Sequence, residues 1–324
     1  MKMKTNFFGK KVLISGATGL IGKTTVSRLL LYGAEVYAIV RDISRAQKIF
    51  GSHGQIRFIE ADITTVPLHN LGIDYMIHGA ANTSSQAFVK DPVSIVKTNI
   101  WGTIRMLELA KQNPVKSFIF LSSMEVYGTP SSDEKILETY SSNLDTMSVR
   151  SCYPESKRQC ENLCTCYATQ FGIPAKVIRL TQTLGPGVVY NDQRVFAEFA
   201  RCVIEEKDIV LHTKGDTKRC YLYTEDATDA IFYVLLFGNT GEAYNAANEA
   251  TYCSIYEMAS MVAQRFGKGR VSVRIQEDNP GCFGYAPTLH MNLDTGKLRH
   301  LGWQPKTGLE EMFAHLVESM ERLQ

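Results

Sequence analysis

Residues 11–22 have the sequence KVLISGATGLIG, in which a short run of β-branched and apolar residues leads into three glycines. The apolar run predicts a buried strand, and the stretch that follows the glycines predicts a helix. Glycines at this spacing let a backbone turn tightly and approach a pyrophosphate, which the loop amides and the positive end of the helix then hold. The stretch therefore predicts a dinucleotide-binding α/β domain. The expected cofactor contacts here are Gly16, Gly19, Leu20, Ile21 and Gly22.

Short β-branched runs alternate with helical stretches through the first half of the chain. This alternation predicts a parallel sheet covered by helices on both faces, which is a doubly wound α/β domain. The predicted strands after residues 11–15 are Glu35–Val40, Ile56–Glu60, Tyr75–His78, Ser117–Leu121 and Lys176–Leu180. The predicted helices include Ile21–Tyr32, Val93–Gln112 and Ser156–Phe171.

The regular alternation ends at Gly185-Pro186-Gly187. We therefore expect a cofactor-binding domain over residues 1–185 and a smaller lobe over residues 186–324, with residues 220–250 returning to the first domain. In open α/β sheets ligands bind beyond the carboxyl ends of the strands, so the smaller lobe is expected to cover that edge and bind substrate. Prolines and glycines indicate loops within the lobe at Pro280, Gly281, Gly284 and Pro287.

The composition, 44% hydrophobic and 21% charged over 324 residues, is that of a globular protein and excludes disordered and fibrous classes. The 35 basic and 33 acidic side chains nearly balance, which predicts neither nucleic acid nor an anionic membrane as a partner. The sequence shows no apolar stretch of signal-peptide or membrane-spanning length, so we expect a soluble, cytoplasmic protein. The eight cysteines are scattered, and we expect reduced thiols and no metal site.

The end of the second predicted strand indicates which nicotinamide cofactor binds. In such domains an acidic side chain there bonds the adenosine ribose hydroxyls, whereas an arginine favours an additional 2′-phosphate. Val40 occupies the position of the acid and Arg41 follows it, so NADP is the first choice. The alternative, in which Arg41 is a solvated charge and Asp42 caps the next helix, keeps NAD open.

Further cofactor contacts are expected where the third and fourth strands end. Asp62 can accept a hydrogen bond from the adenine amino group, or it can cap a turn. His78 is better suited to a structural hydrogen bond than to catalysis, and the small residues after it let a cofactor lie close. The expected contacts at these strand ends are Asp62, Ile63, Ala80 and Ala81.

Ser123 follows the fifth predicted strand, and Tyr153 and Lys157 open the helix after it. Residues four apart share one face of a helix, so the Lys157 ammonium is expected to lower the pKa of the Tyr153 phenol from its reference of about 10. Ser123 can hold the same substrate oxygen as Tyr153. The three residues therefore predict a proton relay that accompanies hydride transfer to a nicotinamide.

At these residues the sequence resembles the extended short-chain dehydrogenase/reductase family, in particular its nucleotide-sugar epimerases, dehydratases and decarboxylases. The resemblance covers nearly the whole chain. The segments that carry it are Gly16–Gly22, Asp62, His78–Ala81, Asn99–Thr103, Ser123–Gly128, Tyr153 with Lys157, Gly185-Pro186, Arg219–Tyr221, Thr224–Asp226 and Leu301–Pro305. It implies a Rossmann domain, a bound or exchanged nicotinamide cofactor, and a nucleoside-diphosphate sugar as substrate. It also implies a cofactor contact at Asn99 and a homodimer.

The resemblance implies substrate contacts as well. Arg219 resembles the arginine that binds the substrate pyrophosphate, a role suited to a bidentate cation, although a surface salt bridge is the alternative. Gln182 stands where the family usually has asparagine, which leaves the contact there open. The expected substrate contacts are Thr83, Ser84, Gln182, Arg194 and Arg219.

Met124, Glu125 and the turn near His290 bear on the reaction. The resemblance to 4,6-dehydratases includes Glu125, but those enzymes carry an aspartate where Met124 stands. The UDP-glucuronate decarboxylases place their glutamate in a similar Ser-Glu-Val-Tyr-Gly setting, but they also use an arginine that residues 288–291 lack. We therefore expect chemistry at sugar C4, as a 4-epimerase or 4-keto-reductase, with dehydration or decarboxylation as alternatives.

A binding or regulatory protein that keeps the fold without the chemistry is the rival of another class. The presence of a complete serine, tyrosine and lysine set argues against it. The residues expected to take part in catalysis are Ser123, Glu125, Tyr153 and Lys157.

Overall fold

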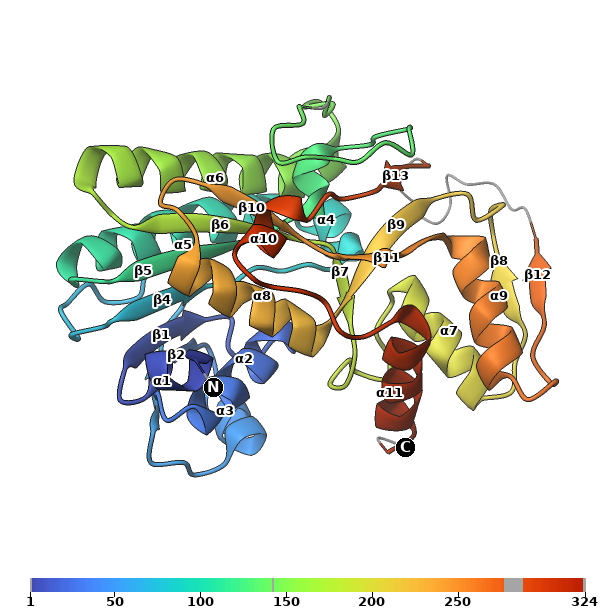
Figure 1. The fold of residues 1–324 in the computed structure, drawn as a ribbon, viewed down its shortest axis with the longest axis horizontal. Coiled ribbons are helices and arrows are strands. Elements are labelled where there is room, and N and C mark those ends of the chain that lie inside the picture. The colour runs from blue at the N-terminus through green and yellow to red at the C-terminus, as the bar shows by residue number, and fades with distance from the viewer. Residues whose placement is uncertain (1, 142, 277–287, 323–324) are drawn as a thin grey trace.

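The computed structural model describes residues 2–141, 143–276 and 288–322. Among these residues the central feature is a seven-stranded sheet in which neighbouring strands are parallel (Figure 1). The strands, in their order across the sheet, are β10 (Ala243–Ala246), β6 (Ala175–Leu180), β5 (Ser117–Ser123), β4 (Tyr75–His78), β1 (Lys11–Ser15), β2 (Glu35–Val40) and β3 (Ile56–Glu60). The chain order reverses between β1 and β4, and ligands bind at such a point in open α/β sheets.

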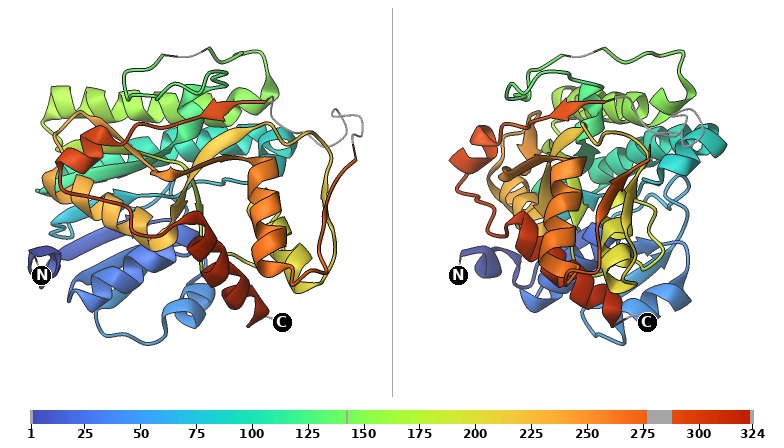
Figure 2. Two further views of the ribbon diagram at one scale, coloured as in Figure 1. Left: turned by 45° about the vertical axis from the view of Figure 1, so that its right-hand side comes forward. Right: turned by 90° about the vertical axis from the view of Figure 1, so that its right-hand side faces the viewer.

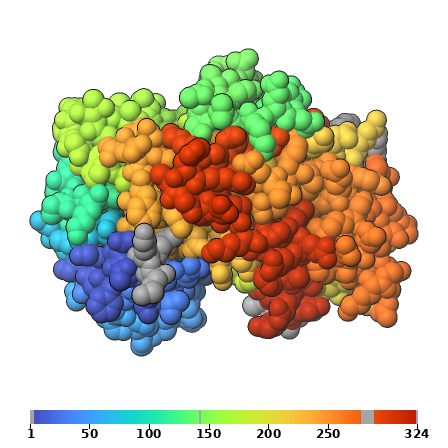
Figure 3. Space-filling model, viewed as in Figure 1, coloured from blue at the N-terminus to red at the C-terminus, as the bar shows by residue number. Residues whose placement is uncertain are grey.

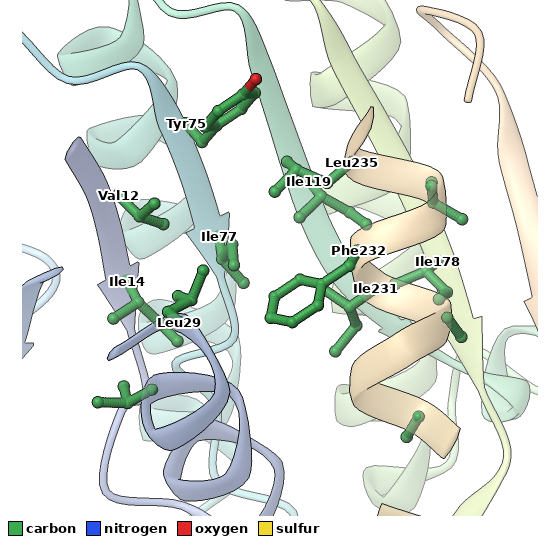
Figure 4. Close-up of a cluster of buried hydrophobic side chains, with 14 of the residues drawn as sticks. Val12, Ile14, Leu29, Tyr75, Ile77, Ile119, Ile178, Ile231, Phe232 and Leu235 are labelled. Carbon is green, nitrogen blue, oxygen red and sulfur yellow. The ribbon is translucent and has the colours of Figure 1, made fainter. Parts of the chain in front are cut away.

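Helices cover both faces of this sheet (Figures 1 and 2). They are α2 (Leu20–Leu31) and α8 (Thr224–Phe237) on one face, and α5 (Pro92–Gln112) and α6 (Cys152–Phe171) on the other. Buried side chains such as Ile77 and Phe232 join the first pair to the sheet (Figure 4). Met106 and Phe118 lie in the core on the opposite face. The predicted doubly wound α/β fold is confirmed.

The predicted strand bounds differ from the observed ones chiefly at β5. This strand continues beyond Leu121 and pairs with β6 up to the partners Ser123 and Leu180. The two serines at its end are polar, so the apolar pattern ends before the strand does. Because α6 begins at Cys152, Tyr153 lies in its first turn, close to the end of β5.

The second lobe is built on a smaller mixed sheet with helices around it. Its central strand is β9 (Lys218–Tyr223), which is antiparallel to β11 (Asn248–Ser254) and parallel to two short strands. The other elements of the lobe are β7 (Gln182–Leu184), β13 (His290–Met291), the paired strands β8 (Ile209–Leu211) and β12 (Val273–Ile275), and the helices α7 (Val195–Ile204), α9 (Ile255–Phe266) and α11 (Leu309–Glu321). Their apolar faces meet in a separate core that includes Phe196, Met258 and Phe313.

The chain passes back from the second lobe to the first sheet. α8 and β10 return there after β9, and Trp303, just after α10 (Gly296–His300), is buried in the same core. The Asp226 carboxylate at the start of α8 accepts hydrogen bonds of 3.0 Å from the amides of Lys306 and Thr307. These contacts hold the C-terminal residues across the middle of the molecule, where Figure 3 shows them in red.

Three further expectations concern loops in the second lobe, membrane-spanning helices and metal sites. The loops expected at Pro280, Gly281, Gly284 and Pro287 lie outside the described residues. Within the described part of the chain, no helix has both the length and the apolar character needed to cross a membrane. In that same part, no three His, Cys, Asp or Glu side chains come together as a group that could hold a metal ion.

The glycine loop packs against its surroundings at backbone contact distance. Gly16 has a φ of +76°, and a Cβ there would lie 2.6 Å from the carbonyl carbon of Gly79. A Cβ at Gly22 would lie 2.1 Å from the Gly16 carbonyl oxygen and 2.8 Å from the backbone of Ala17. These glycines therefore let α2 start directly against the ends of β1 and β4.

We predict that Gly22→Ala lowers the free energy of unfolding by about 1–3 kcal/mol, because the added methyl must displace backbone atoms. The measurement is urea denaturation without cofactor, so that weaker cofactor binding does not contribute. Gly54→Ala is the control, since a Cβ there meets nothing within 4 Å. Equal losses for the two variants would contradict this account of the loop.

Candidate active site

The loop between β1 and α2 leaves backbone amides available to an anion. Gly19 is the N-cap of α2 and has no side chain with which to bond them. The Gly19 amide itself donates to the Gly16 carbonyl at 3.1 Å, which closes the turn. Amides in the first turn of a helix have no partner within the helix and attract phosphate. The loop therefore fits a dinucleotide pyrophosphate at Leu20, Ile21 and Gly22.

Arg41 and Asp42 follow β2 and have different surroundings. Arg41 is exposed. The Asp42 side chain accepts a hydrogen bond of 2.9 Å from the Arg45 amide and so caps α3 (Ile43–Phe50). Asp42 thus caps the next helix, as in the alternative that keeps NAD open, and Arg41 is the exposed charged group at this strand end.

Asp62 lies beyond the end of β3, near Arg41. Hydrogen bonds from the side chain and amide of Thr64 lower the pKa of Asp62, and the charge of Arg41 adds to this effect. Asp62 also lines a surface hollow of about 370 Å³, together with Thr98 and Trp101. The two residues expected to contact the adenosine half of a cofactor therefore lie close together.

Buried side chains form the floor beneath the ends of β1 and β4. His78 Nδ1 lies 2.7 Å from Ser15 Oγ, and its Nε2 lies 3.2 Å from Thr103 Oγ1. Burial lowers the pKa of His78 to about 3, so this histidine is neutral and structural. Asn99 Nδ2 donates to Ser156 Oγ at 2.8 Å and thereby joins α5 to α6. The remaining cofactor contacts expected on this floor, all buried or partly buried, are Ile63, Ala80 and Ala81.

Ser123, Tyr153 and Lys157 meet at the carboxyl end of β5. The Ser123 side chain is close enough to the Tyr153 phenol to favour its ionised form. Lys157 Nζ lies 5.8 Å from the centroid of the Tyr153 ring and donates to the Leu121 carbonyl at 2.8 Å. The structure thus brings together the three residues from which the sequence predicts a proton relay.

The expectation that Lys157 lowers the pKa of Tyr153 is wrong for the polypeptide itself. Burial raises the pKa of this phenol, and the charge of Glu125 raises it further. Burial also lowers the pKa of Lys157 to about 8, since desolvation disfavours the charged form of either group. The ammonium donates to the Leu121 carbonyl. Tyr153 is therefore neutral, and it holds its proton more firmly than a phenol in water does.

Glu125 has neighbours that sequence analysis did not single out. It lies on the 3₁₀ helix η1 (Met124–Tyr127), and its carboxylate is paired with Arg150 of a second 3₁₀ helix, η2 (Val149–Ser151), at 3.3 Å. Phe88 of α4 (Ser85–Lys90) stacks on the Tyr153 ring with centroids 4.4 Å apart. Only the position of Arg150, three residues before Tyr153, could have drawn attention to it. Nothing in the sequence pattern indicated Phe88.

A largely buried ion pair lies beside the carboxyl end of β5. Arg179 Nη2 of β6 lies 2.7 Å from Glu161 Oε2 of α6, and the two side chains are 14% and 12% exposed. Glu161 also accepts a hydrogen bond of 2.5 Å from Ser122, the neighbour of Ser123. Arg179 Nη1 donates to the Tyr127 hydroxyl at 2.7 Å. The pair therefore connects the helix of Tyr153 and Lys157 to the strand and turn of Ser123 and Glu125.

Arg219 and Gln182 lie together on neighbouring strands of the second lobe. Arg219 Nη1 donates to Gln182 Oε1 at 3.3 Å. Arg219 Nε is buried and has no hydrogen-bond partner among the described residues. An unpaired buried donor is costly, so this guanidinium is suited to an anionic ligand.

The other expected substrate contacts are Arg194, Thr83 and Ser84. Arg194, the N-cap of α7, donates to both carboxylate oxygens of Asp192, from Nε at 2.9 Å and from Nη2 at 2.6 Å. Thr83 and Ser84 are exposed in the segment that connects β4 to α4. Arg194 would have to leave Asp192 before its guanidinium could bind a substrate through both nitrogens.

Met124 and His290 are the residues from which the sequence distinguishes the possible reactions, and the structure shows their surroundings. Met124 is 6% exposed in an apolar cluster with Cys220, and its sulfur accepts a hydrogen bond of 3.3 Å from Thr181. His290 Nδ1 lies 3.1 Å from an Asp133 carboxylate oxygen. Position 124 therefore presents no proton-transfer group, and His290 is next to a carboxylate on the rim of the second lobe.

Comparison with known proteins identifies relatives at the level of sequence. The profile of the NAD dependent epimerase/dehydratase family matches residues 12–247. UDP-glucuronic acid decarboxylase 1 of Xenopus tropicalis is 28% identical over 305 residues, which cover 93% of this chain and 70% of the relative. UDP-glucuronic acid decarboxylase 5 of Arabidopsis thaliana is 29% identical over 307 residues, which cover 93% and 86%.

Solved structures share the fold at lower identity. A UDP-glucose 4-epimerase from Thermotoga maritima, with UDP-glucose, matches with a TM-score of 0.81 and 22% identity, covering 97% of this chain and 99% of that one. A variant of UDP-glucuronic acid 4-epimerase from Bacillus cereus, in complex with UDP-4-deoxy-4-fluoro-glucuronic acid and NAD, matches with a TM-score of 0.83 and 23% identity, covering 97% and 100%. The resemblance found in the sequence is thus confirmed, and the chain belongs to the NAD dependent epimerase/dehydratase family.

Proposed function

We propose that this enzyme oxidises or reduces C4 of a nucleoside-diphosphate sugar. The observation that carries the proposal is the meeting of Ser123, Tyr153 and Lys157 at the carboxyl end of β5. The hydroxyls of Ser123 and Tyr153 can hold one substrate oxygen between them, and Tyr153 can donate a proton to it or accept one from it. When bound, the nicotinamide accepts or returns the hydride, and the positive charge of its oxidised ring favours the phenolate.

Within this class we favour a 4-epimerase or a 4-keto-reductase. Dehydration in this family uses an acid at the position of Met124, whose side chain here lies in an apolar cluster. Decarboxylation is the second candidate, because Glu125 is close enough to Tyr153 to raise its pKa and the two relatives described above are UDP-glucuronic acid decarboxylases. Against it, residues 288–291 supply no arginine. Arg219 is proposed to bind the pyrophosphate of the substrate.

The proposal predicts turnover of a member of a nucleotide-sugar panel that includes UDP-glucose, UDP-N-acetylglucosamine and UDP-glucuronic acid. The purified enzyme is incubated with oxidised and reduced cofactors, and the products are separated and weighed by mass spectrometry. Unchanged mass with a new retention time indicates epimerisation, and a change of two hydrogens indicates oxidation or reduction at C4. Loss of water or of CO₂ would replace our preferred reaction by dehydration or decarboxylation.

Tyr153→Phe is the matched variant for this assay. Because it removes only the proton-transfer hydroxyl, we expect turnover to fall by about 100-fold or more while cofactor binding stays nearly unchanged. Near-normal turnover of the variant would refute the role given to Tyr153. If the wild-type enzyme turned over nothing in a broad panel but bound nucleotide sugars, the non-catalytic alternative would be favoured.

We further propose that NADP is the preferred cofactor. Val40 at the end of β2 is buried and has no carboxylate that could bind the ribose hydroxyls. The Asp42 carboxylate accepts a hydrogen bond from the Arg45 amide and so caps α3. Arg41 is the exposed cation at this point, near Asp62. A charge-assisted hydrogen bond from Arg41 to a 2′-phosphate would favour NADP over NAD.

Arg41→Ala is therefore expected to weaken NADPH binding more than NADH binding, by about 1–3 kcal/mol. Titration of both reduced cofactors against the wild type and the variant, followed by fluorescence or calorimetry, measures this difference. Tighter binding of NADH than of NADPH by the wild-type enzyme would show that NAD is the physiological cofactor. So would an equal loss of affinity for both cofactors in the variant, and Arg41 would then be only a neighbour of adenine.

A homodimer and a cytoplasmic location complete the proposal. The exposed side of α5 includes Val93 and Trp101, and α6 ends with the exposed Phe171. Packing of α5 and α6 against the same helices of a second copy would bury such side chains. We predict a dimer at micromolar concentration by analytical ultracentrifugation, and a monomer at that concentration would exclude this assembly.

A further inference from the structure

Arg150 contacts the surroundings of Tyr153 on two sides. Its Nη1 donates to Glu125 Oε2 at 3.3 Å, and its Nη2 donates to Glu125 Oε1 at 3.5 Å. Its guanidinium carbon lies 5.8 Å from the centroid of the Phe88 ring. Phe88 in turn lies nearly parallel to the Tyr153 ring, with an interplanar angle of 13°. One guanidinium therefore joins the Glu125 carboxylate to the aromatic ring that stacks on Tyr153.

Burial distinguishes the members of this group. Phe88 and Tyr153 are 1% and 4% exposed, whereas the side chains of Arg150 and Glu125 are 31% and 26% exposed. An ion pair with this exposure contributes little to the stability of a fold. Beside a buried phenol, however, the same charges act through a medium of lower dielectric constant than water. The effect of the pair should therefore appear in the ionisation of Tyr153 rather than in stability.

The charged and titratable groups around the phenol come from three elements. η1 supplies Glu125, whose charge opposes ionisation of Tyr153, and η2 supplies Arg150. α6 supplies Lys157, whose ammonium donates to the Leu121 carbonyl, and Cys160. β5 contributes the uncharged hydroxyl of Ser123, and α4 presents the uncharged ring of Phe88. Arg150 is thus the cation that is paired with the carboxylate acting on the phenol.

We propose that Arg150 is a positioning residue for the proton relay. It holds the Glu125 carboxylate and the Phe88 ring on two sides of Tyr153, and it offsets the charge of Glu125. Glu125 then opposes proton release from the phenol less than an unpaired carboxylate would. Arg150 itself does not exchange a proton with substrate. The inference rests on the proposed function, because it assigns Arg150 to the relay that performs that reaction.

The test reads the ionisation of Tyr153 directly in the holoenzyme loaded with oxidised cofactor. Tyrosinate absorbance is titrated with pH, and the same titration in a Tyr153→Phe background is subtracted. Arg150→Met should move the Tyr153 midpoint upward by about one pH unit, because the carboxylate is no longer paired. Arg150→Lys should restore part of the shift, because it returns the charge without the bidentate geometry.

Two further variants show whether Arg150 acts through Glu125. Glu125→Gln should move the midpoint downward, and adding Arg150→Met to it should raise the midpoint less than Arg150→Met does in the wild type. Glu155→Gln is the control. It removes a different ion pair, between Arg158 and Glu155 on α6, whose atoms are 3.4 Å apart and whose side chains are about as exposed as those of Arg150 and Glu125. That control should leave the midpoint where it is in the wild type.

Turnover provides the second readout once a substrate is found. In the oxidation direction, in which Tyr153 accepts the proton, the pH profile of Arg150→Met should move the same way, with a loss of about tenfold near neutral pH that recovers at higher pH. A loss that is equal at every pH, together with an unshifted absorbance midpoint, would show a merely structural role and overturn the proposal. The absorbance titration uses no sugar, so an unproductive substrate panel would count against the proposed function alone.

Discussion

The ion pair between Glu161 and Arg179 is the interaction on which the catalytic arrangement depends. Glu161 belongs to the helix that carries Tyr153 and Lys157, and Arg179 belongs to β6, beside the strand that ends in Ser123. Separating the two would leave a charge largely out of water without a partner, which typically costs about 3–5 kcal/mol. Since Ser122 and Tyr127 also bond this pair, helix, strand and turn keep one relative position.

Desolvation then decides the chemistry of the site. The first sheet and its helices bury Tyr153 and Lys157, so the phenol keeps its proton and the ammonium binds its proton less firmly than in water. The ionisation of the phenol is also affected by charge that reaches it from outside α6. Glu125 and Arg150 on the two 3₁₀ helices are such charges, and a bound nicotinamide would add another. The fold supplies the geometry of the proposed proton relay. Whether Tyr153 donates or accepts the proton then depends on the charges of Glu125, Arg150 and a bound nicotinamide.

Much of this arrangement could be predicted because its signals are local. The strand to Ser15, the turn at Gly16–Gly22 and the helix after it are adjacent in sequence, and each residue type has a direct conformational reason. Tyr153 and Lys157 are likewise one helical turn apart. The effect of Lys157 on the phenol was predicted wrongly, because spacing along a helix gives proximity but not solvation. Phe88 and Arg150 went unnoticed because each lies in a helix of only six or three residues, which is too short to show a periodic pattern.

The sequence alone determined the alternation of strands and helices in the first half of the chain and the glycine loop, and it predicted Ser123, Tyr153 and Lys157 as a proton relay. It did so because hydrophobic periodicity and backbone conformation are properties of neighbouring residues. Only the tertiary structure decided that Met124 is buried near Cys220, that Arg194 is paired with Asp192, and that Arg150 meets both Glu125 and Phe88. Arg150 meets Glu125 and Phe88 across 25 and 62 positions of sequence, and Met124 is in the same cluster as Cys220, 96 positions away. Such distances are closed by packing of the whole sheet and its helices, which no local pattern encodes.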